Sequence, residues 1–410
     1  MAGDRDYVTC AIAGCGPAGA MLGLLLARAG VDVLVLEKHA DFFRDFRGDT
    51  VHPSTLDVLS ELGLFERFSQ LRHERVNELS VVTDGGPITV ADFRHLRARH
   101  PYIAMVPQWD LLDLLTSEAR RYPSFRLEME AEALALIRSG DGVDGLTYRH
   151  PDGERQVRAQ LTVAADGRHS AIRSSSGLEA VEYGAPMDVL WFRLPRRDDD
   201  TDRSGGRVAS GHIVVTINRG DYWQVGYVIP KGSGRELRAG GIETLRSSMA
   251  ELFPALAERV DSIEGWDDVS ELEVRVNRLR RWHLPGLLCI GDAAHAMSPV
   301  AGVGINLAVQ DAVAAANVLA EPLLAGTLTE RDLARVQRRR VVPVALTQAL
   351  QRLVQRRLLA PVLRGRRGPR PPKVVRELTQ SRAVGWLPAR LVGLGLRPEH
   401  VRSPLADRFG

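Results

Sequence analysis

Three glycines near the N-terminus have the spacing that a phosphate-binding turn requires. The turn reads Gly14-Cys15-Gly16-Pro17-Ala18-Gly19 and stands between a short apolar run and a longer helix-like run. In such a turn the first glycine lets the chain reverse, the second lets a pyrophosphate approach the backbone, and the third lets helix and strand pack closely. The helix N-terminus adds unpaired N–H groups and the positive end of its dipole. The pattern predicts a dinucleotide site.

An acidic residue at the end of the next strand narrows this prediction. Glu37 stands 23 residues after Gly14, where a carboxylate accepts hydrogen bonds from both hydroxyls of an adenosine ribose. A negative charge there disfavours a 2′-phosphate, so the expected nucleotide is FAD or NAD(H) and not NADP(H). The alternative is a tight turn that binds nothing, and the complete series of strand, turn, helix and acid argues against it.

A second motif distinguishes FAD from NAD. Gly291-Asp292-Ala293-Ala294-His295 follows a buried-strand pattern and leads to a turn from Ala301 to Asn306 at a helix start. Asp292 can accept hydrogen bonds from the ribityl chain that FAD has and NAD lacks. The turn offers backbone N–H groups to negative charge that grows at N1 and O2 of a reduced flavin. The alternative, that Asp292 only caps a helix, leaves the following glycines and Asn306 unexplained.

A third motif, Ala165-Asp166-Gly167-Arg168-His169-Ser170, stands between the other two. By itself it could be a turn that Asp166 caps before a helix. The three strings, in this order and at these separations, resemble the class A flavin monooxygenases, the p-hydroxybenzoate hydroxylase-like family. The resemblance covers roughly residues 7 to 345. It implies that Asp166 serves FAD together with the reducing nicotinamide.

Two further segments are similar to this family. The string from Arg47 to Leu56 matches the segment whose arginine contacts the FAD pyrophosphate and ribityl region, which implies that role for Arg47. Gln108 stands where many members have an arginine or a glutamine facing the flavin chain, although it could instead cap the helix that begins at Asp110. The predicted cofactor-binding residues are Gly14, Gly16, Pro17, Ala18, Gly19, Glu37, Lys38, Arg47, Gln108, Asp166, Gly291, Asp292, Pro299, Gly302, Gly304, Ile305 and Asn306.

The resemblance also implies a reaction cycle on non-covalently bound FAD. NAD(P)H should bind transiently at the surface, because the sequence offers no second glycine turn in a βαβ setting. After NAD(P)H reduces FAD, oxygen adds at flavin C4a, and the hydroperoxide hydroxylates or epoxidises an aromatic, phenolic or polyketide-like small molecule. Pro299 and the turn from Gly302 to Gly304 are expected to exclude water beside C4a.

No residue can be assigned as a general base, so the catalytic residues are unknown. The aromatic string from Tyr222 to Pro230 is similar to the Trp-x-Trp-x-Ile-Pro string of flavin halogenases, but its second aromatic residue is displaced. Hydroxylation is therefore favoured over halogenation. Candidates for the base by location, each better explained as a packing or surface residue, are His212, Tyr222, Tyr227 and His295.

The elements that position these motifs are expected to interleave along the chain. Hydrophobic patterning predicts strands at Tyr7 to Ala13 and Val31 to Leu36, with a helix at Pro17 to Ala29 between them. The resemblance implies an α/β fold: a FAD-binding Rossmann-like three-layer domain of the glutathione reductase type 2, an inserted mixed β-sheet substrate domain and C-terminal helices. The predicted boundaries are residues 1–76, 106–180 and 286–345 for the FAD domain, 77–105 and 181–285 for the substrate domain, and 346–410 for the C-terminal helical region.

Composition limits the other functions. The 54 basic residues are spread against 51 acidic ones, for a formal charge of +3, which disfavours nucleic-acid binding. Three cysteines are too few for a disulfide framework, and no Cys/His cluster has zinc spacing, so we expect no metal. No signal-peptide pattern is present, and the apolar runs are too short to cross a bilayer. We expect a cytoplasmic monomer or homodimer without an integral membrane segment.

Three alternatives remain open. The chain could be a flavin-dependent reductase or oxidase of a polyprenyl or lipid substrate. It could also be a flavin-free binding protein similar to the GDP-dissociation inhibitors, although Asp292 and the turn that follows it would then have no use. The basic stretch from Arg356 to Arg402 could bind a membrane surface or a partner, but packing as helices across the two domains explains it better.

Overall fold

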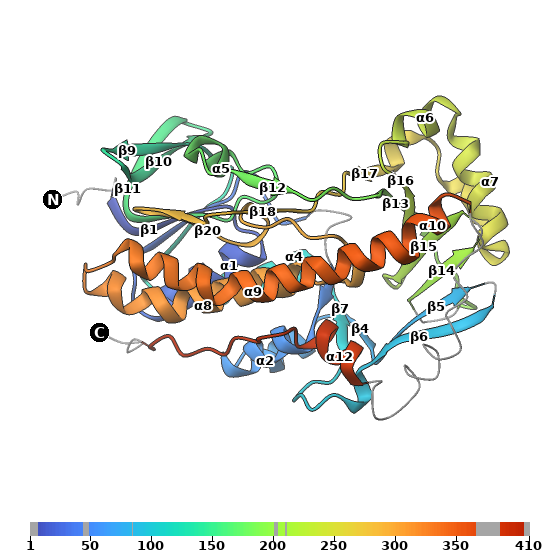
Figure 1. Ribbon diagram of the computed structural model, residues 1–410, viewed down its shortest axis with the longest axis horizontal. Helices are drawn as coiled ribbons and strands as arrows, with labels where there is room; N and C mark the ends of the chain where they lie inside the picture. Colours follow the sequence, from blue (N-terminus) through green and yellow to red (C-terminus); the bar gives the residue numbers. More distant parts are fainter. Residues whose placement is uncertain are drawn as a thin grey trace.

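The computed structural model describes residues 7–43, 49–83, 85–200, 204–209, 211–365 and 386–405. Over these ranges two large sheets lie toward opposite ends of an elongated molecule, and long helices run between them (Figure 1). The α/β architecture expected from the sequence is confirmed. The predicted domain boundaries stay a prediction, because the sheets do not by themselves divide the chain.

The first sheet carries the N-terminal βαβ unit. In the described residues it has eight strands, with the order β19-β20-β11-β1-β2-β8 and an antiparallel extension of β10 and β9. Strands β20, β11, β1, β2 and β8 are mutually parallel, which requires helices to cover them. The strands are β1 (Tyr7–Ala13), β2 (Val33–Leu36), β8 (Phe125–Glu128), β9 (Glu132–Ser139), β10 (Gly142–His150), β11 (Gly153–Ala164), β19 (His283–Leu284) and β20 (Leu287–Cys289).

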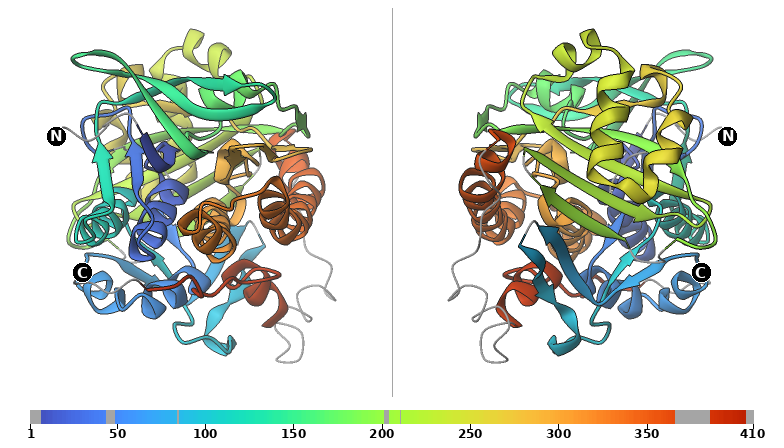
Figure 2. Two further views of the ribbon diagram at one scale, coloured as in Figure 1. Left: turned by 90° about the vertical axis from the view of Figure 1, so that its left-hand side faces the viewer. Right: turned by 90° about the vertical axis from the view of Figure 1, so that its right-hand side faces the viewer.

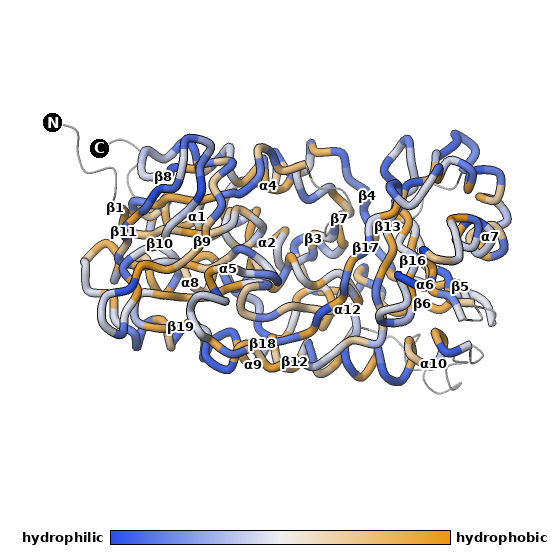
Figure 3. The backbone as a smooth tube through the Cα atoms, turned by 90° about the horizontal axis from the view of Figure 1, so that it is seen from above, coloured by the Kyte–Doolittle hydropathy of each residue, from blue (hydrophilic) through white to orange (hydrophobic). Residues whose placement is uncertain are grey.

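Three helices cover one face of this sheet. They are α1 (Pro17–Arg28), α4 (Gln108–Ala119) and α8 (Gly304–Leu324), and together with β1 and β2 they enclose the largest apolar core. Helix α8 is long and apolar enough to cross a membrane by composition, but 83% of its most apolar window is buried inside the protein. It is therefore explained as a core helix, and its hydrophobic colour inside the molecule is visible in Figure 3.

The second sheet lies toward the other end of the molecule. Over the described residues it has seven strands in the order β17-β13-β16-β15-β14-β5-β6. Helix α7 (Ile242–Leu252) and the short helical segment η2 (Pro254–Ser262) cover its outer face, and the right-hand view of Figure 2 shows α7 across the strands. The strands are β5 (Glu78–Thr83), β6 (Gly86–Asp92), β13 (Met187–Pro195), β14 (Gly205–Ala209), β15 (His212–Asn218), β16 (Tyr222–Pro230) and β17 (Ser270–Leu272).

Smaller elements connect the two sheets. Strand β3 (Thr50–Val51) pairs with β7 (Ile103–Met105), which also pairs with β4 (Glu74–Val76). Helix α2 (Pro53–Glu61) follows β3 directly. Helix α9 (Glu330–Val354) packs beside α8 and continues through a π-helical segment to α10 (Ala360–Leu363) at the second sheet (Figure 1).

The C-terminal region departs from the helical prediction. After α12 (Trp386–Gly393), residues 394–405 form no helix and run along α2 (Figure 1). We call residues 394–405 the C-terminal strap. Gly395 has φ +76, and Pro398 and Pro404 lack the N–H group that a helix interior needs, so the strap cannot continue the helix. The sequence had predicted a C-terminal helical region over residues 346–410.

Candidate cofactor site

Four sequence motifs begin at one level of the first sheet. Leu36, Ala13, Ala164 and Cys289, the last residues of β2, β1, β11 and β20, are partners across the sheet. Glu37, the first glycine turn, the Asp166 turn and the Gly291 turn therefore leave the sheet side by side. The carboxyl edge of a parallel sheet is where this class of fold binds its ligand. The strand register thus brings together motifs that are more than 250 residues apart in sequence.

The glycines of the first turn have distinct reasons to be glycine. Gly14 has φ +93, and a Cβ there would lie 2.6 Å from the Ala165 carbonyl oxygen. A Cβ on Gly19 would lie 1.9 Å from the Gly14 carbonyl oxygen, so helix and turn touch at this point. A Cβ on Gly16 would meet no atom of the described residues within 4 Å. Packing therefore requires the first and third glycines, whereas the second faces open space where a pyrophosphate can approach.

Glu37 lies directly beside this open space. Its carboxylate accepts hydrogen bonds from the backbone N–H groups of Cys15 (3.1 Å) and His39 (3.2 Å), which fix its orientation. Each carboxylate oxygen can accept a further bond, as a ribose would require. Next to the end of β2 is a cavity of about 420 Å³, lined by Ala40, Asp41, Phe42, Phe43, Trp109, Asp113, Arg120 and Met129.

In the turn before α8, packing likewise requires one glycine, whereas another glycine faces open space. Gly302 has φ +63, and a Cβ there would lie 2.3 Å from the hydroxyl oxygen of Thr50, which donates a hydrogen bond to the Gly302 carbonyl at 2.7 Å. Gly304 begins α8, and a Cβ on it would meet none of the described atoms within 4 Å. No described side chain caps α8, so its first N–H groups remain available for negative charge.

Asn306 fastens this turn to helix α2. Its side-chain oxygen accepts hydrogen bonds from the hydroxyls of Ser54 (2.7 Å) and Thr55 (2.9 Å), and all three residues are buried. The predicted role of Asn306 toward the cofactor stays a prediction. What the structure adds is a positioning contact between two segments about 250 residues apart, which no single motif in the sequence could indicate.

His52 connects the same turn to the C-terminal region. Its Nε2 atom lies 3.1 Å from the Gly302 carbonyl oxygen, and its Nδ1 atom lies 2.8 Å from the Val392 carbonyl oxygen at the end of α12. Burial lowers the pKa of His52 to about 4, although both carbonyls act in the opposite direction. A neutral imidazole has one N–H and can donate to only one of these carbonyls. His52 lies within the string from Arg47 to Leu56, whose local pattern gives no sign of these distant contacts.

The Asp292 carboxylate is partly open. Its side chain is 30% exposed, and Oδ2 lies 3.4 Å from an Nη atom of Arg168. The short helical turn of Gly291–Ala293 begins after Ile290 and has no side-chain cap among the described residues. The alternative in which Asp292 serves as a helix cap is therefore not supported. A carboxylate held at its edge by an arginine keeps lone pairs for a ligand hydroxyl.

Asp166 has a different local environment. Its carboxylate accepts a hydrogen bond from the Ser170 hydroxyl and one from the Ile172 N–H at 3.2 Å, at the start of α5 (Ala171–Ser176). Burial raises its pKa. The side chain thus stabilises the helix that follows, while its backbone lies against Gly14. The contribution to FAD that the resemblance implies for Asp166 stays a prediction.

The remaining predicted residues are placed as follows. Gln108 is the first residue of α4 and caps nothing there, because Pro107 occupies the cap position. Lys38 is exposed at the end of β2. Pro299 precedes the short turn of Val300–Gly302. Arg47 lies outside the described residues.

Two of the general-base candidates lie on the outer face of the second sheet, which α7 covers. Nδ1 of His212 lies 2.6 Å from the Tyr227 hydroxyl, and the Tyr227 ring packs in the core beneath α7, on the face turned away from the first sheet. His295 is 1% exposed and lies 2.5 Å from the Asp311 carboxylate. Tyr222 is partly buried with the Arg193 guanidinium 4.6 Å above its ring. The packing interpretation given to His212, Tyr227 and His295 matches these contacts.

The opposite face of the second sheet contacts the residue that leads into β3. Gln224 donates a hydrogen bond to the Asp49 carboxylate at 3.0 Å, and Arg219 lies 2.5 Å from the same carboxylate, with both charged side chains almost fully buried. On this face the Trp191 ring lies over Gly226, where a Cβ would approach it to 2.9 Å. The Trp191 Nε1 atom is buried and has no hydrogen-bond partner within the described residues.

Comparison with known proteins gives a consistent family assignment. A family model described as "FAD binding domain" matches residues 7–349. The 6-methylpretetramide 4-monooxygenase of Streptomyces rimosus is 32% identical over 340 residues, covering 82% of this chain and 81% of that protein. The 12-dehydrotetracycline 5-monooxygenase/anhydrotetracycline 6-monooxygenase of Streptomyces rimosus subsp. rimosus is 29% identical, and this chain spans only 60% of its length. The structure of OxyS anhydrotetracycline hydroxylase from Streptomyces rimosus has a TM-score of 0.73 at 24% identity, covering 95% of this chain and 77% of that one.

Proposed function

Since the chain belongs to the FAD binding domain family, as an FAD-dependent monooxygenase, we propose that it uses NAD(P)H and oxygen to hydroxylate a polycyclic, polyketide-like aromatic compound. This proposal rests mainly on one observation. Glu37 and the three turns at Gly14, Asp166 and Gly291 all follow strand residues that are aligned at the carboxyl edge of the first sheet. The relatives named for 6-methylpretetramide and for 12-dehydrotetracycline and anhydrotetracycline support the substrate class.

The residues at this edge fit FAD. The space beside Gly16 would take the pyrophosphate, Glu37 the ribose and Asp292 the ribityl hydroxyls. The uncapped N-terminus of α8 at Gly304 would face the flavin ring. FAD, when bound, supplies the redox chemistry, taking a hydride from NAD(P)H and activating oxygen. A flavin-free binding protein would have no use for the open spaces at both glycines.

The inner face of the second sheet suits a flat apolar substrate. Trp191, Ile217 and Val215 lie on it at alternate strand positions, and Val215 is 39% exposed. The unpaired Nε1 of Trp191 is a hydrogen-bond donor that no described residue satisfies. A buried donor without a partner is costly, so we propose that the side chains covering it shift when the substrate binds and that a carbonyl or hydroxyl oxygen of the substrate then accepts from it.

The test is an assay of the purified, FAD-loaded protein with NADH or NADPH and a panel of polycyclic aromatic compounds. We expect one NAD(P)H and one oxygen to be consumed per product, and one atom of ¹⁸O₂ to appear in that product. Protein that takes up FAD but oxidises or reduces its substrate without incorporating ¹⁸O would support the reductase or oxidase alternative. Protein that cannot take up FAD would refute the proposal altogether.

Trp191→Phe tests the substrate contact separately. Loss of one hydrogen bond should raise KM by about three- to tenfold and leave FAD affinity unchanged. Trp266→Phe is a matched control, because Trp266 also has a buried Nε1 without a described partner but packs at the core under the outer helices. Equal KM changes in both variants would show that Trp191 does not contact the substrate.

A further inference from the structure

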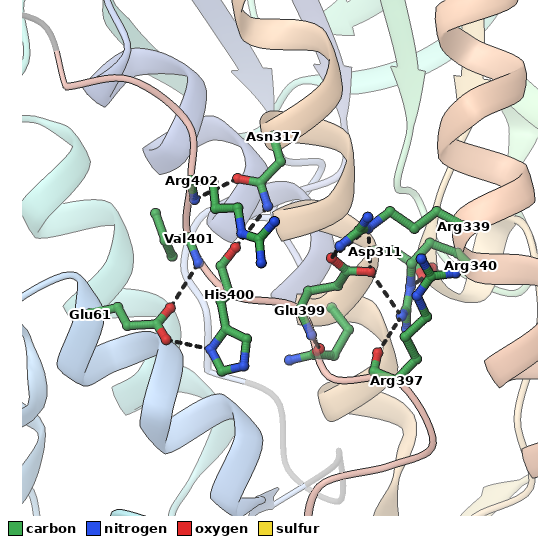
Figure 4. A network of polar contacts seen from close by, with 11 residues as sticks. Glu61, Asp311, Asn317, Arg339, Arg340, Arg397, Glu399, His400, Val401 and Arg402 are labelled. Atoms are coloured by element: carbon green, nitrogen blue, oxygen red, sulfur yellow. Dashed lines mark hydrogen bonds and ion pairs between the residues drawn. The ribbon is translucent and has the colours of Figure 1, made fainter.

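The C-terminal strap lies beyond the part of the chain that the family model matches, which ends at residue 349. It nevertheless contacts the helices that carry the cofactor site. Figure 4 shows the strap crossing α8 and α9, with polar side chains on both sides of it. The Glu399 N–H donates to the side-chain oxygen of Gln310 on α8, which fixes the position of the strap backbone.

Glu399 is the buried charge of the strap. Its side chain is fully inaccessible to solvent. Both carboxylate oxygens accept from Nε of Arg339 at 2.7 Å, and Oε1 lies 3.7 Å from Nη1 of Arg340. Arg339 is 31% exposed, whereas Arg340 is 1% exposed. A buried charge needs compensating charges around it, and Glu399 is one of those that face Arg340.

Arg340 is held in one orientation from two sides. Its Nη1 donates to the Arg397 carbonyl oxygen of the strap at 3.3 Å and lies near Glu399, while its Nε donates to Oδ1 of Asp311 at 2.9 Å. Asp311 is completely buried on α8. Burial alone would raise the pKa of Asp311, but His295 and Arg340 outweigh burial and hold that pKa below its usual value.

Asp311 in turn holds the motif that carries Asp292. Its second oxygen, Oδ2, accepts from the Gly291 N–H at 3.1 Å and lies 2.5 Å from Nε2 of His295. Gly291 and His295 bracket Asp292 in sequence. A continuous series of ion pairs and hydrogen bonds therefore runs from the strap through Arg340 and Asp311 to both ends of this turn.

Other contacts hold the strap without leading to the cofactor site. The Glu61 carboxylate of α2 lies 2.6 Å from Nδ1 of His400 and accepts from the Val401 N–H at 2.8 Å. The Asn317 side chain bonds the His400 carbonyl and the Arg402 N–H. Figure 4 shows Glu61 on the other side of the strap from Arg340. Glu61 and Glu399 thus both hold the strap in place. Of their described contacts, only those of Glu399 lead to Asp311, through Arg340.

We propose that Glu399 is a positioning residue for the flavin. It fixes the Arg340 guanidinium, which keeps Asp311 against the Gly291 N–H and thereby sets the position of Asp292. The inference rests on the proposed FAD site, because Asp292 is the group whose placement it explains. It assigns a cofactor-directed role to a segment that the family model does not cover.

The test compares Glu399→Gln with Glu61→Gln in the full chain. Apoprotein of each is titrated with FAD, and the visible circular dichroism and midpoint potential of the bound flavin are measured together with thermal unfolding. We expect Glu399→Gln to weaken FAD binding about three- to tenfold and to change the dichroism, a typical size for coupling through an intermediate residue. Glu61→Gln should match the wild type in affinity, dichroism and potential, even where its unfolding temperature falls.

Three outcomes are decisive. Wild-type flavin properties in Glu399→Gln, or equal changes in both variants, would overturn the inference, because the strap would then act only as a cover. If Glu399→Gln does not fold, Glu399→Asp keeps the charge but shortens its reach, and it should change the dichroism while Glu61→Asp does not. A wild-type protein that binds no FAD would instead refute the proposed function, a result that the titration of unaltered apoprotein separates from the other two.

Discussion

Single residues at the cofactor site are constrained either by packing or by the space that a ligand needs. Gly14, Gly19 and Gly302 have no room for a side chain, whereas Gly16 and Gly304 have room that the described residues leave empty. The sequence motif alone does not make this distinction, because every glycine in it looks equally required. The distinction predicts which substitutions damage the fold and which damage binding.

Gly16→Val and Gly19→Val form a matched pair. Gly16 has φ −71, which valine adopts readily, so the variant should fold with a free energy of unfolding within about 0.5 kcal/mol of wild type. It should weaken FAD binding on the order of a hundredfold, because two backbone hydrogen bonds to a phosphate, at about 3 kcal/mol together, are lost. Gly19→Val should lose more than about 4 kcal/mol of stability. Urea unfolding and FAD titration measure both, and a destabilised Gly16→Val would contradict the assignment.

Substitutions of Asp292 and Asp166 should likewise have different effects, one on FAD binding and the other on stability. Asp292 caps no helix, so Asp292→Ala should lower FAD affinity about tenfold with little change in stability. Asp166 accepts bonds at the start of α5, so Asp166→Ala should cost about 1 to 2 kcal/mol of stability. Flavin content per protein and chemical denaturation distinguish the two effects. Full flavin binding by Asp292→Ala would remove it from the site.

At the scale of elements, the sequence predicted the strands and helices that carry the motifs, because each combines a strong hydrophobic pattern with a glycine turn. It could not predict how α2 and α12 fasten the turn before α8. His52, Thr50 and Ser54 contact partners about 250 to 340 residues away, and such contacts leave no local spacing signal. The C-terminal helical prediction was wrong for residues 394–405, where buried ion pairs and backbone bonds stabilise an irregular segment without a hydrophobic period.

The contact between α2, the glycine turn and α12 gives a pH prediction. The pKa of His52 is about 4 in the fold against about 6.5 when exposed, so between these values the unfolded chain binds more protons and stability rises with pH. His52 should raise the free energy of unfolding by about 3 kcal/mol between pH 4 and 6.5. It should add nothing to the pH dependence above pH 6.5. His52→Gln should show a correspondingly flatter dependence. Urea unfolding at pH 4.5 and 7.5 measures the change in unfolding free energy with pH for the wild type and for His52→Gln. Subtracting one change from the other cancels the contributions of all other titrating groups. The same pH dependence in both proteins would refute the prediction.

At the scale of the whole molecule, the register of the strands in the first sheet assembles the proposed cofactor site, because no single segment contains all of its residues. The resemblance implied the α/β fold correctly, since the order and separation of the motifs follow the order of the elements. The face of the second sheet that contacts Asp49 could not be predicted, because Gln224 in β16, like Trp191 in β13, alternates with core residues in a mostly apolar strand. Burial of that strand on both faces removes the usual alternation between polar and apolar residues.

The packing of the whole protein also determines thiol reactivity. Cys10, Cys15 and Cys289 are fully buried, and burial raises the pKa of each thiol above its usual value. The native protein should therefore not react with Ellman's reagent at pH 8, and the unfolded protein should release three equivalents. Absorbance at 412 nm with and without guanidinium measures this directly. Rapid reaction of any thiol in the native protein would show that the core around the first turn opens readily.

The position of Glu399 in the chain has a consequence for biosynthesis. Proteins are made from the N-terminus, and their early segments begin to fold while later ones are still being synthesised. The glycine turns, Asp292 and Asp311 all leave the ribosome before the strap that orients Arg340. A nascent chain can therefore form its sheets before it can fix the Gly291 turn, and tight capture of the cofactor must wait until the strap has been synthesised.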